Sequence, residues 1–312
     1  MCSGPVRRER AMEGVDKMHA GSLVSRRRFL GGLASGAALG AAAGPAFGAE
    51  KKRWAMRMST SSVHYGSLPI EQACERIANL GFEAIDIWAN FGKCKHLDDA
   101  AERLGAEGLK QLLSKHNLKV NAFSIYTTGY EPYAELLGKV GGGVAVRGSQ
   151  GGEPAPEDLT KRMKAFVEGL KPSIELAEEH DSYLAIENHG GALLHTHDSL
   201  KAFVDINTSK RLGVALAPFH LQSINAPIPE AIRTVGKQLL FFYAWQNQPG
   251  IAQLPGHGPT DFTPSIQALA EIGYRRYVNP FMHQEPEPDA MSAALKKSRE
   301  YLMNCYEKAV GK

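Results

Sequence analysis

The chain has 312 residues and a formal net charge of +3, from 36 Lys and Arg against 33 Asp and Glu. This length is sufficient for one large α/β domain or two ordinary ones. The first 49 residues hold seven of the basic and three of the acidic residues, so the rest of the chain carries 29 basic and 30 acidic residues. A nearly neutral body without a basic run lacks the electrostatic footprint of a nucleic-acid-binding protein.

The segment before Glu50 has the pattern of an export signal. Residues 25–30 read Ser-Arg-Arg-Arg-Phe-Leu, which fits the twin-arginine pattern, and a weakly apolar run rich in Ala and Gly follows. A single membrane anchor is the alternative, but the run is short for a span. We predict a signal peptide at 1–49, cleaved before a mature protein of 50–312. The mature protein would then be periplasmic or otherwise extracytoplasmic, without a stable membrane span.

Three cysteines, Cys74, Cys94 and Cys305, remain in the body. Their odd number, wide separation and lack of a Cys-x-x-Cys spacing do not indicate a disulfide framework. A single disulfide bridge between two of them is the alternative.

The body alternates predicted strands and helices. Short apolar runs predict strands at 54–59, 84–88, 120–125, 143–146, 183–186, 212–217, 239–245 and 277–281. Apolar residues at helical spacing, together with Pro, Gly and capping residues, predict helices at 69–80, 104–116, 133–137, 157–180, 199–206, 229–235, 264–272 and 290–309. We expect three of these helices to begin at an N-cap residue: Asp198 for the helix at 199–206, Thr263 for the helix at 264–272 and Asp289 for the helix at 290–309. The Gly- and Pro-rich loop at 147–156 is expected to be mobile.

Eight strands alternating with helices over about 260 residues predict a single-domain (β/α)₈ TIM barrel, an α/β fold. A doubly wound open sheet is the rival architecture. It would need a glycine-rich phosphate loop after the first strand, where residues 59–62 read Ser-Thr-Ser-Ser.

In a TIM barrel the functional side chains lie at the C-terminal ends of the strands. Glu187 ends the apolar strand at 183–186, and a buried carboxylate there is costly unless a cation or a reaction uses it. Glu187 is therefore the leading candidate. The other candidates at strand ends are His220, His189, Gln246, Asn279, His283, Trp88 and Arg147.

Several roles stay open for these residues. Glu187, His189 and His220 could hold a divalent metal ion, or Glu187 could be a general base while His220 fixes a substrate hydroxyl. Glu187 could also pair with Arg147 and do no chemistry. Trp88 could stack on a sugar ring or pack inside the barrel. The His-Thr-His run at 195–197 lies directly before a capped helix, and we interpret it as a solvated turn rather than a metal site.

At these residues the sequence resembles the xylose isomerase-like TIM-barrel family, the sugar phosphate isomerase/epimerase group. The resemblance extends from Trp54 to the C-terminus and rests on segments 80–87, 185–189, 216–220 and 278–281. It implies four metal ligands: a Glu on strand five, an Asp on strand six, a His on strand seven and a Glu on strand eight. It also implies that a His three residues after the Asp contacts the substrate.

The chain departs from this pattern. Glu187 matches the first ligand and His220 the substrate histidine, but Ala217 stands in place of the Asp and Asn279 in place of the last Glu. Strand seven offers no His. The resemblance therefore implies either a different ligand set for Mn²⁺, Mg²⁺ or Zn²⁺, drawn from Glu187, His189, His220 and His283, or no metal at all. Without the strand-eight Glu, a two-base epimerisation also lacks its second base.

The sequence and the resemblance together predict an exported enzyme of the sugar isomerase/epimerase type. It would abstract a proton next to a carbonyl of a small carbohydrate, in an isomerisation, an epimerisation or a lyase step. Glu187 would be the base or a metal ligand, and His220 would orient or protonate a substrate oxygen. The alternative is a non-catalytic carbohydrate-binding barrel with a degenerate metal site. A metal-dependent phosphodiesterase ranks far behind, and a homo-oligomer is left open.

Overall fold

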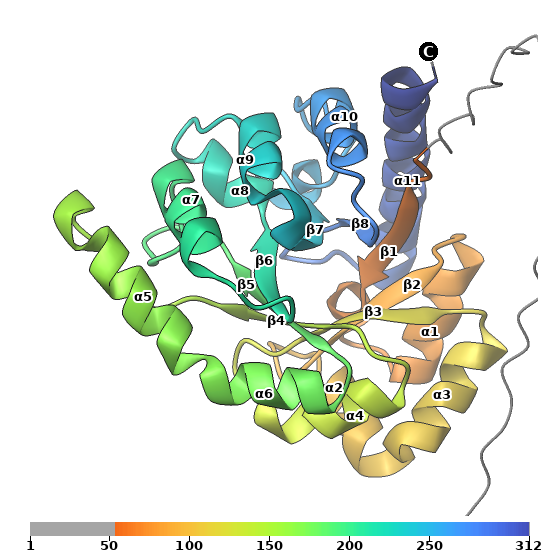
Figure 1. Cartoon of the computed structure of the whole chain (residues 1–312). Helices are drawn as coiled ribbons and strands as arrows, with labels where there is room; N and C mark the ends of the chain where they lie inside the picture. Colours follow the sequence, from red (N-terminus) through yellow and green to blue (C-terminus); the bar gives the residue numbers. More distant parts are fainter. Residues whose placement is uncertain (1–53, 312) are drawn as a thin grey trace, which may run out of the picture. The chain divides into compact units, whose positions relative to one another are not determined.

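Eight segments of four to six residues form parallel strands that close into a barrel in the computed structural model, which describes residues 54–311. Each strand pairs with the next in sequence, and β8 pairs with β1, as Figure 1 shows. The strands are β1 (Arg57–Ser61), β2 (Ala84–Trp88), β3 (Lys119–Ser124), β4 (Val144–Gly148), β5 (Tyr183–Glu187), β6 (Leu212–Leu216), β7 (Leu239–Ala244) and β8 (Tyr277–Pro280). The predicted (β/α)₈ barrel is confirmed. The predicted signal peptide lies outside the described residues.

Helices surround the strands. They are α1 (Ile70–Asn79), α2 (His96–Asp99), α3 (Gly105–Lys115), α4 (Ala134–Lys139), α5 (Leu159–Gly169), α6 (Lys171–Glu179), α7 (His197–Ile206), α8 (Pro218–Gln222), α9 (Ile228–Val235), α10 (Thr263–Glu271) and α11 (Pro288–Val310). Two of the short helices, α2 and α8, have no counterpart in the sequence prediction. None of the helices in the described part of the chain is long and apolar enough to cross a membrane.

The prediction of one continuous helix at 157–180 is wrong. It divides into α5 and α6 at Leu170, and Pro172 lies in the first turn of α6. Proline lacks the amide hydrogen that a continuous helix would use at this position, so the chain restarts there.

The predicted N-caps are also wrong by one or two positions. Thr196, not Asp198, caps α7, because its hydroxyl accepts a hydrogen bond from the Ser199 amide at 3.2 Å. Asp289 lies inside the first turn of α11, where its charge still favours the positive end of the helix. Thr263 is the first residue of α10 rather than the residue before it.

Strand residues alternate between the barrel interior and the surrounding helices. The interior is filled by one apolar cluster, which includes Val144, Val146, Ala185, Ala215 and Phe241. A second and larger cluster lies between the strands and the helices. The same alternation directs Glu187, two residues after Ala185, toward the inside of the barrel at its C-terminal end.

A chain of polar side chains crosses the interior below that end. Asn279 accepts a hydrogen bond from the Ser59 hydroxyl at 2.8 Å and donates one to the Ser61 hydroxyl at 3.0 Å. Asn121 donates to Ser59 at 2.8 Å. All four residues are buried, so the side chain of Asn279 is occupied by its neighbours in the barrel.

The three body cysteines are free and buried.

Candidate active site

Two buried carboxyl groups mark the C-terminal mouth of the barrel, and the first is Asp86 on β2. It accepts hydrogen bonds from the hydroxyls of Ser61 and Ser124 at 2.6 and 2.8 Å, and from the indole of Trp88 at 2.6 Å. Burial raises the pKa of Asp86 to about 6, although these three donors oppose the rise. The group is therefore held in a fixed position and is not free to bind a ligand.

Glu187, the second carboxyl, ends β5 and is 6% exposed. Burial raises the pKa of Glu187 to about 8; a hydrogen bond with Tyr126 lowers it, and the charge of Asp86 raises it further. The Tyr126 hydroxyl lies 2.9 Å from that of Tyr243, and burial raises the pKa of both phenols well above 10. Both phenols therefore keep their protons at neutral pH, while Glu187 can gain or lose one near that pH.

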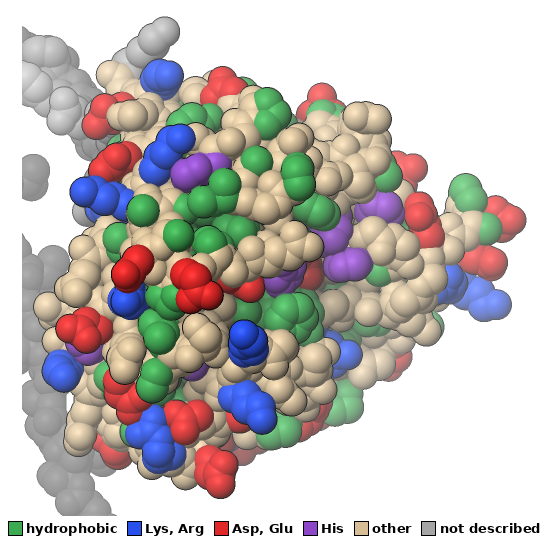
Figure 2. Space-filling model, turned by 180° about the vertical axis from the view of Figure 1, so that it is seen from behind, with side chains coloured by type: hydrophobic (Ala, Val, Ile, Leu, Met, Phe, Trp, Pro, Cys, Tyr) green, Lys and Arg blue, Asp and Glu red, His purple; other side chains and the backbone are tan. Residues whose placement is uncertain are grey.

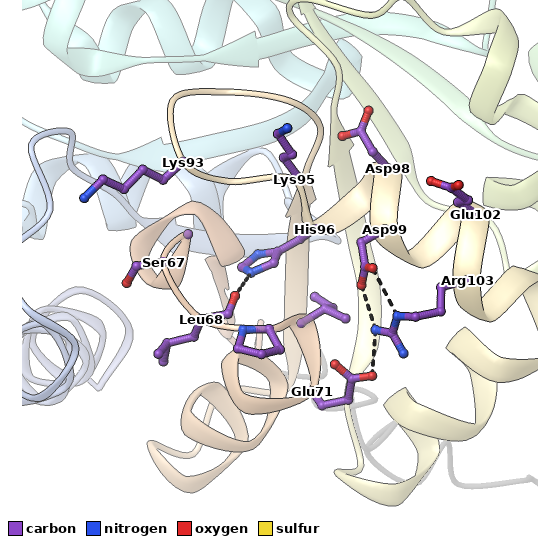
Figure 3. A pocket seen from close by; sticks show the side chains of 13 residues that line it. Ser67, Leu68, Glu71, Lys93, Lys95, His96, Asp98, Asp99, Glu102 and Arg103 are labelled. Carbon is purple, nitrogen blue, oxygen red and sulfur yellow. Dashed lines mark hydrogen bonds and ion pairs between the residues drawn. The ribbon is translucent and has the colours of Figure 1, made fainter.

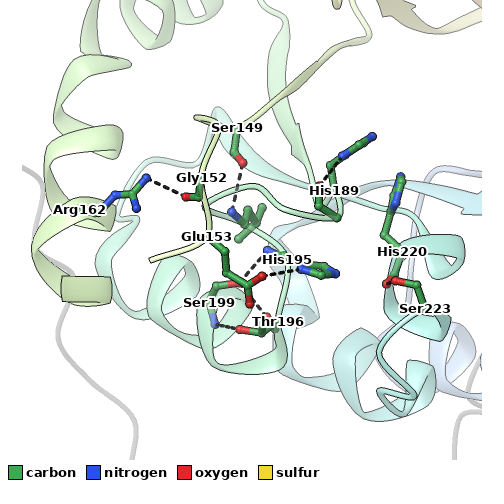
Figure 4. Close-up of polar contacts among 12 residues, drawn as sticks. Ser149, Gly152, Glu153, Arg162, His189, His195, Thr196, Ser199, His220 and Ser223 are labelled. Carbon is green, nitrogen blue, oxygen red and sulfur yellow. Dashed lines mark hydrogen bonds and ion pairs between the residues drawn. The ribbon is translucent and has the colours of Figure 1, made fainter. Parts of the chain in front are cut away.

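A group of histidines follows β5 and β6: His189 and His195 lie on the loop after β5, and His220 lies in the short helix α8. The rings of His189 and His220 are 4.1 Å apart, and burial lowers the pKa of His220 to about 3, with the nearby histidines lowering it further. His220 is therefore a neutral imidazole. Its Nε2 atom and that of His195 are buried without a hydrogen-bond partner among the described residues. Figure 4 shows this group, and Figure 2 shows histidines gathered on one face beside hydrophobic side chains.

Aromatic rings connect the two parts of the mouth. Trp88 stacks on Phe281 at 5.4 Å, and Trp245 stacks on Phe219 at 4.1 Å. His283 contacts both tryptophans and stacks on Phe91 at 5.1 Å. Trp88 is only 2% exposed, so its faces are used mainly inside the protein, and sugar stacking on it stays a prediction.

Three predicted site residues do not present a free side chain to this mouth. Arg147 falls between the inward-facing Val146 and Gly148 positions of β4, and its charge acts on Glu131. Gln246 is fully buried, with its amide donating to the Leu254 carbonyl at 2.8 Å and its oxygen accepting from the Thr260 amide. Asn279 belongs to the polar chain in the interior.

Sequence reasoning missed the role of Asn188, which ties β5 to β6. Its side-chain oxygen accepts from the Ala217 amide at 2.7 Å, and its amide donates to the Ala217 carbonyl at 3.1 Å. This pair of bonds fixes the end of β5, with Glu187 and His189, against the start of α8, which carries His220.

The residues present do not fit the metal site that the resemblance implies. Within residues 54–311, no group of three or more His, Cys, Asp or Glu side chains is arranged to hold a metal ion. Ala217 has no ligating atom, and Asn279 uses its side chain on two serines. The predicted set of Glu187, His220 and His283 does not converge as a metal site in this structure.

A separate surface groove of about 700 Å³ lies next to α1 and α2, and Figure 3 shows it. Its charged side chains are paired: Arg103 contacts Asp99 at 2.7 Å and Glu71 at 2.8 Å. His96 contacts the Leu68 carbonyl at 2.8 Å. Exposed pairs of this kind describe a solvated surface rather than a reactive centre.

Comparisons with solved structures agree with the fold. The E. coli 3-keto-D-glucoside 4-epimerase YcjR is 17% identical with a TM-score of 0.63, over 79% of this chain and all of its own. The IolI protein, in a structure with a zinc atom, is 16% identical with a TM-score of 0.65, over 82% of this chain and all of its own. D-Psicose 3-epimerase is 18% identical with a TM-score of 0.60, over 82% of this chain and 99% of its own.

No curated protein matches the sequence. A family model, described as xylose isomerase-like TIM barrel, matches residues 74–303 and so spans most of the barrel. These residues include Asp86 and Glu187 and the four histidines described above, His189, His195, His220 and His283. The chain belongs to the xylose isomerase-like TIM-barrel family.

Proposed function

We propose that this protein is an exported enzyme that abstracts a proton next to the carbonyl of a small carbohydrate. The observation that carries the proposal is Glu187, a carboxyl group at the end of a barrel strand whose pKa burial raises to about 8. A general base works best when its pKa is close to the operating pH. The sugar epimerases among the structural neighbours support the substrate class only, because their identity to this chain is low.

The neighbouring groups suit this chemistry. The ionised form of Glu187 takes a proton from the carbon next to the carbonyl, and Tyr126 stabilises that form by its hydrogen bond. His220, a neutral imidazole with an unpartnered Nε2, contacts the substrate oxygen on which negative charge develops. No step in this scheme requires a metal ion.

A single carboxylate favours isomerisation over epimerisation. An isomerase can remove a proton from one carbon and return it to the neighbouring carbon with the same base, whereas inversion at one carbon needs groups on both faces. Asn279 occupies the place of the second glutamate and is held by Ser59 and Ser61. We therefore rank isomerisation of an aldose or ketose first.

The charges at the mouth favour an unphosphorylated sugar. Carboxyl, hydroxyl, indole and imidazole groups shift the pKa values of Glu187, Asp86 and His220. No Lys or Arg side chain is among the groups that shift these three pKa values. A phosphate beside two carboxyl groups would lack the cation that usually binds it.

The test is proton exchange in D₂O. The purified protein is incubated with a panel of unphosphorylated ketohexoses and ketopentoses and, separately, with their terminal phosphates. NMR should show loss of the proton next to the carbonyl for at least one free sugar, and Glu187→Gln should reduce the rate by about 10³-fold. Exchange with the phosphates alone would contradict the assignment to neutral sugars.

One alternative is a carbohydrate-binding barrel without catalysis, since Ala217 and Asn279 stand where the family resemblance implies two acidic residues. Sugar binding measured by calorimetry without any exchange in D₂O would support that alternative. Export is tested separately, by replacing Arg26 and Arg27 with Lys and following the protein in cell fractions.

A further inference from the structure

His195 is a buried histidine that the scheme above does not use. Its side chain is 7% exposed, and its Nδ1 lies 3.4 Å from the Glu153 carboxylate. A carboxylate at that distance favours the tautomer with the proton on Nδ1, which leaves a lone pair on Nε2. That Nε2 atom is buried without a partner among residues 54–311, at a cost of about 1–3 kcal/mol for an unfilled polar group.

The loops that carry these two residues are joined along their length. Gly151 pairs with Ala192 as an antiparallel bridge, and the Gly152 amide donates to the Gly191 carbonyl at 3.0 Å. The Leu193 amide donates to the Gln150 carbonyl at 2.8 Å. Glu153 is therefore held close to His195 by backbone bonds, although the sequence predicted a mobile loop here.

Gly190 lies beside both His195 and His220. A methyl group added at Gly190 would lie 4.0 Å from Nε2 of His195 and 3.8 Å from Nδ1 of His220, which is ordinary van der Waals contact. The two imidazoles are thus at most about 8 Å apart across this point. In Figure 4 the ring of His195 extends from its loop toward the side on which His220 stands.

We propose that His195, positioned by Glu153, is a second proton-transfer residue of this site and acts with His220 on two neighbouring oxygens of the sugar. This inference rests on the proposed function and adds a second histidine to the proton transfers at the sugar oxygens. Glu153 is a positioning residue, because it acts through His195.

The proton transfers balance over one isomerisation of a ketose. Glu187 removes a proton from the hydroxyl-bearing carbon beside the carbonyl, and that electron pair forms the carbon–carbon double bond of an enediol. The carbonyl oxygen gains a proton from His220, and the neighbouring hydroxyl loses its proton to His195. Glu187 then returns its proton to the former carbonyl carbon. One proton passes from His195 to His220 through water and restores both imidazoles.

The experiment compares two rates in D₂O for the full mature protein and a free ketose that the wild type converts. One rate is deuterium entry into recovered substrate, which depends on Glu187, and the other is formation of the isomerised product. His195→Gln should lower product formation by about 10²-fold while exchange into recovered substrate falls by less than about threefold. Glu153→Gln should shift the ratio the same way by about tenfold.

His197→Gln is the matched control, because His197 lies two residues away and contacts the Thr234 hydroxyl on α9 instead. It should leave both rates unchanged. Glu153 is about half exposed, so its variant keeps the test informative if His195→Gln does not fold.

Equal loss of both rates in Glu153→Gln, or unchanged rates in His195→Gln, would overturn the role of His195 while the proposed function stands. A wild type that exchanges no sugar of the panel would sink the proposed function and this inference together. Stoichiometric Zn²⁺ binding that disappears in His195→Gln would also overturn it, because the imidazoles would then be metal ligands.

Discussion

Two groups of polar side chains lie in the barrel and at its mouth, joined through the Ser61 hydroxyl, and they differ in how many of their buried atoms lack a hydrogen-bond partner. The interior chain of Ser59, Asn121 and Asn279 uses its donors on neighbouring side chains, and one oxygen of Asn121 stays without a partner. The mouth keeps unpartnered nitrogens on both His195 and His220, and a carboxyl group with a raised pKa. Burial is similar in both clusters, so burial alone does not identify a functional site.

The difference teaches how to separate structural from functional polar groups. A buried polar group whose hydrogen bonds are filled stabilises the fold, whereas a group left without a partner destabilises it and needs an explanation, such as a contact that a ligand supplies. The following predictions use this contrast, beginning with the largest expected effect.

Glu187→Gln should change the pH dependence of stability. Glu187 keeps its proton in the folded protein up to about pH 8 but ionises near pH 4.5 in the unfolded chain, so unfolding releases a proton between these values. The wild type should therefore lose stability as pH rises from about 4.5 to 8, by up to a few kcal/mol relative to the variant. Urea unfolding at pH 5, 6.5 and 8 measures this. Parallel curves for the two proteins would show that the pKa is not raised.

His220→Gln should separate activity from stability. Its Nε2 has no partner to lose, so the free energy of unfolding should change by less than about 1 kcal/mol. Turnover should fall by about 10²-fold if the imidazole contacts the substrate. A large loss of stability together with a small loss of turnover would place His220 with the structural cluster.

Ser59→Ala should give the opposite result. Ser59 accepts from Asn121 and donates to Asn279, and its loss leaves both buried amides short of a partner. We expect a loss of about 1–3 kcal/mol in the free energy of unfolding, with turnover per folded molecule unchanged. If turnover falls instead, the interior chain contributes to the site.

Gly190→Ala should have the smallest effect on the fold and a selective effect on binding. The added methyl group contacts both imidazoles at ordinary distances, so KM should rise about tenfold while the free energy of unfolding stays within about 1 kcal/mol. Gly191→Ala is the matched control. Gly191 has a φ of +71° with open space around it, so alanine there should cost about 1 kcal/mol of stability and leave KM unchanged. The same change in KM for both variants would argue against a ligand beside Gly190.

The fold was predictable because each of the eight strands has its own apolar run and turn signals. The site was predictable in part. The strand-end rule selected Glu187 and His220, but it does not say toward which face a side chain points. For Arg147, alternation from Val144 and Val146 already indicated the outer face. The depth of Asn279 follows from its partners on other strands, which no local pattern shows.

The position of His195 next to a helix start predicts a solvated turn, and this prediction is wrong because His195 is buried. Its burial comes from the loop after β4, which covers it through contacts between residues about 40 positions apart in the chain. The two adjacent capping residues Thr196 and Asp198 could not be ranked from sequence for a similar reason, since the choice depends on the path of the chain before the helix.

The joined loops at 148–153 and 189–195 have a consequence for redesign. Because their backbones are bonded to each other, neither can be exchanged for a relative's loop without leaving amides of the other unpaired. The two loops must therefore be transplanted together. Grafting both segments together onto another barrel of this family would transfer Glu153, Gly190 and His195 in their present arrangement. Grafting either segment alone would remove the backbone hydrogen bonds that hold its conformation.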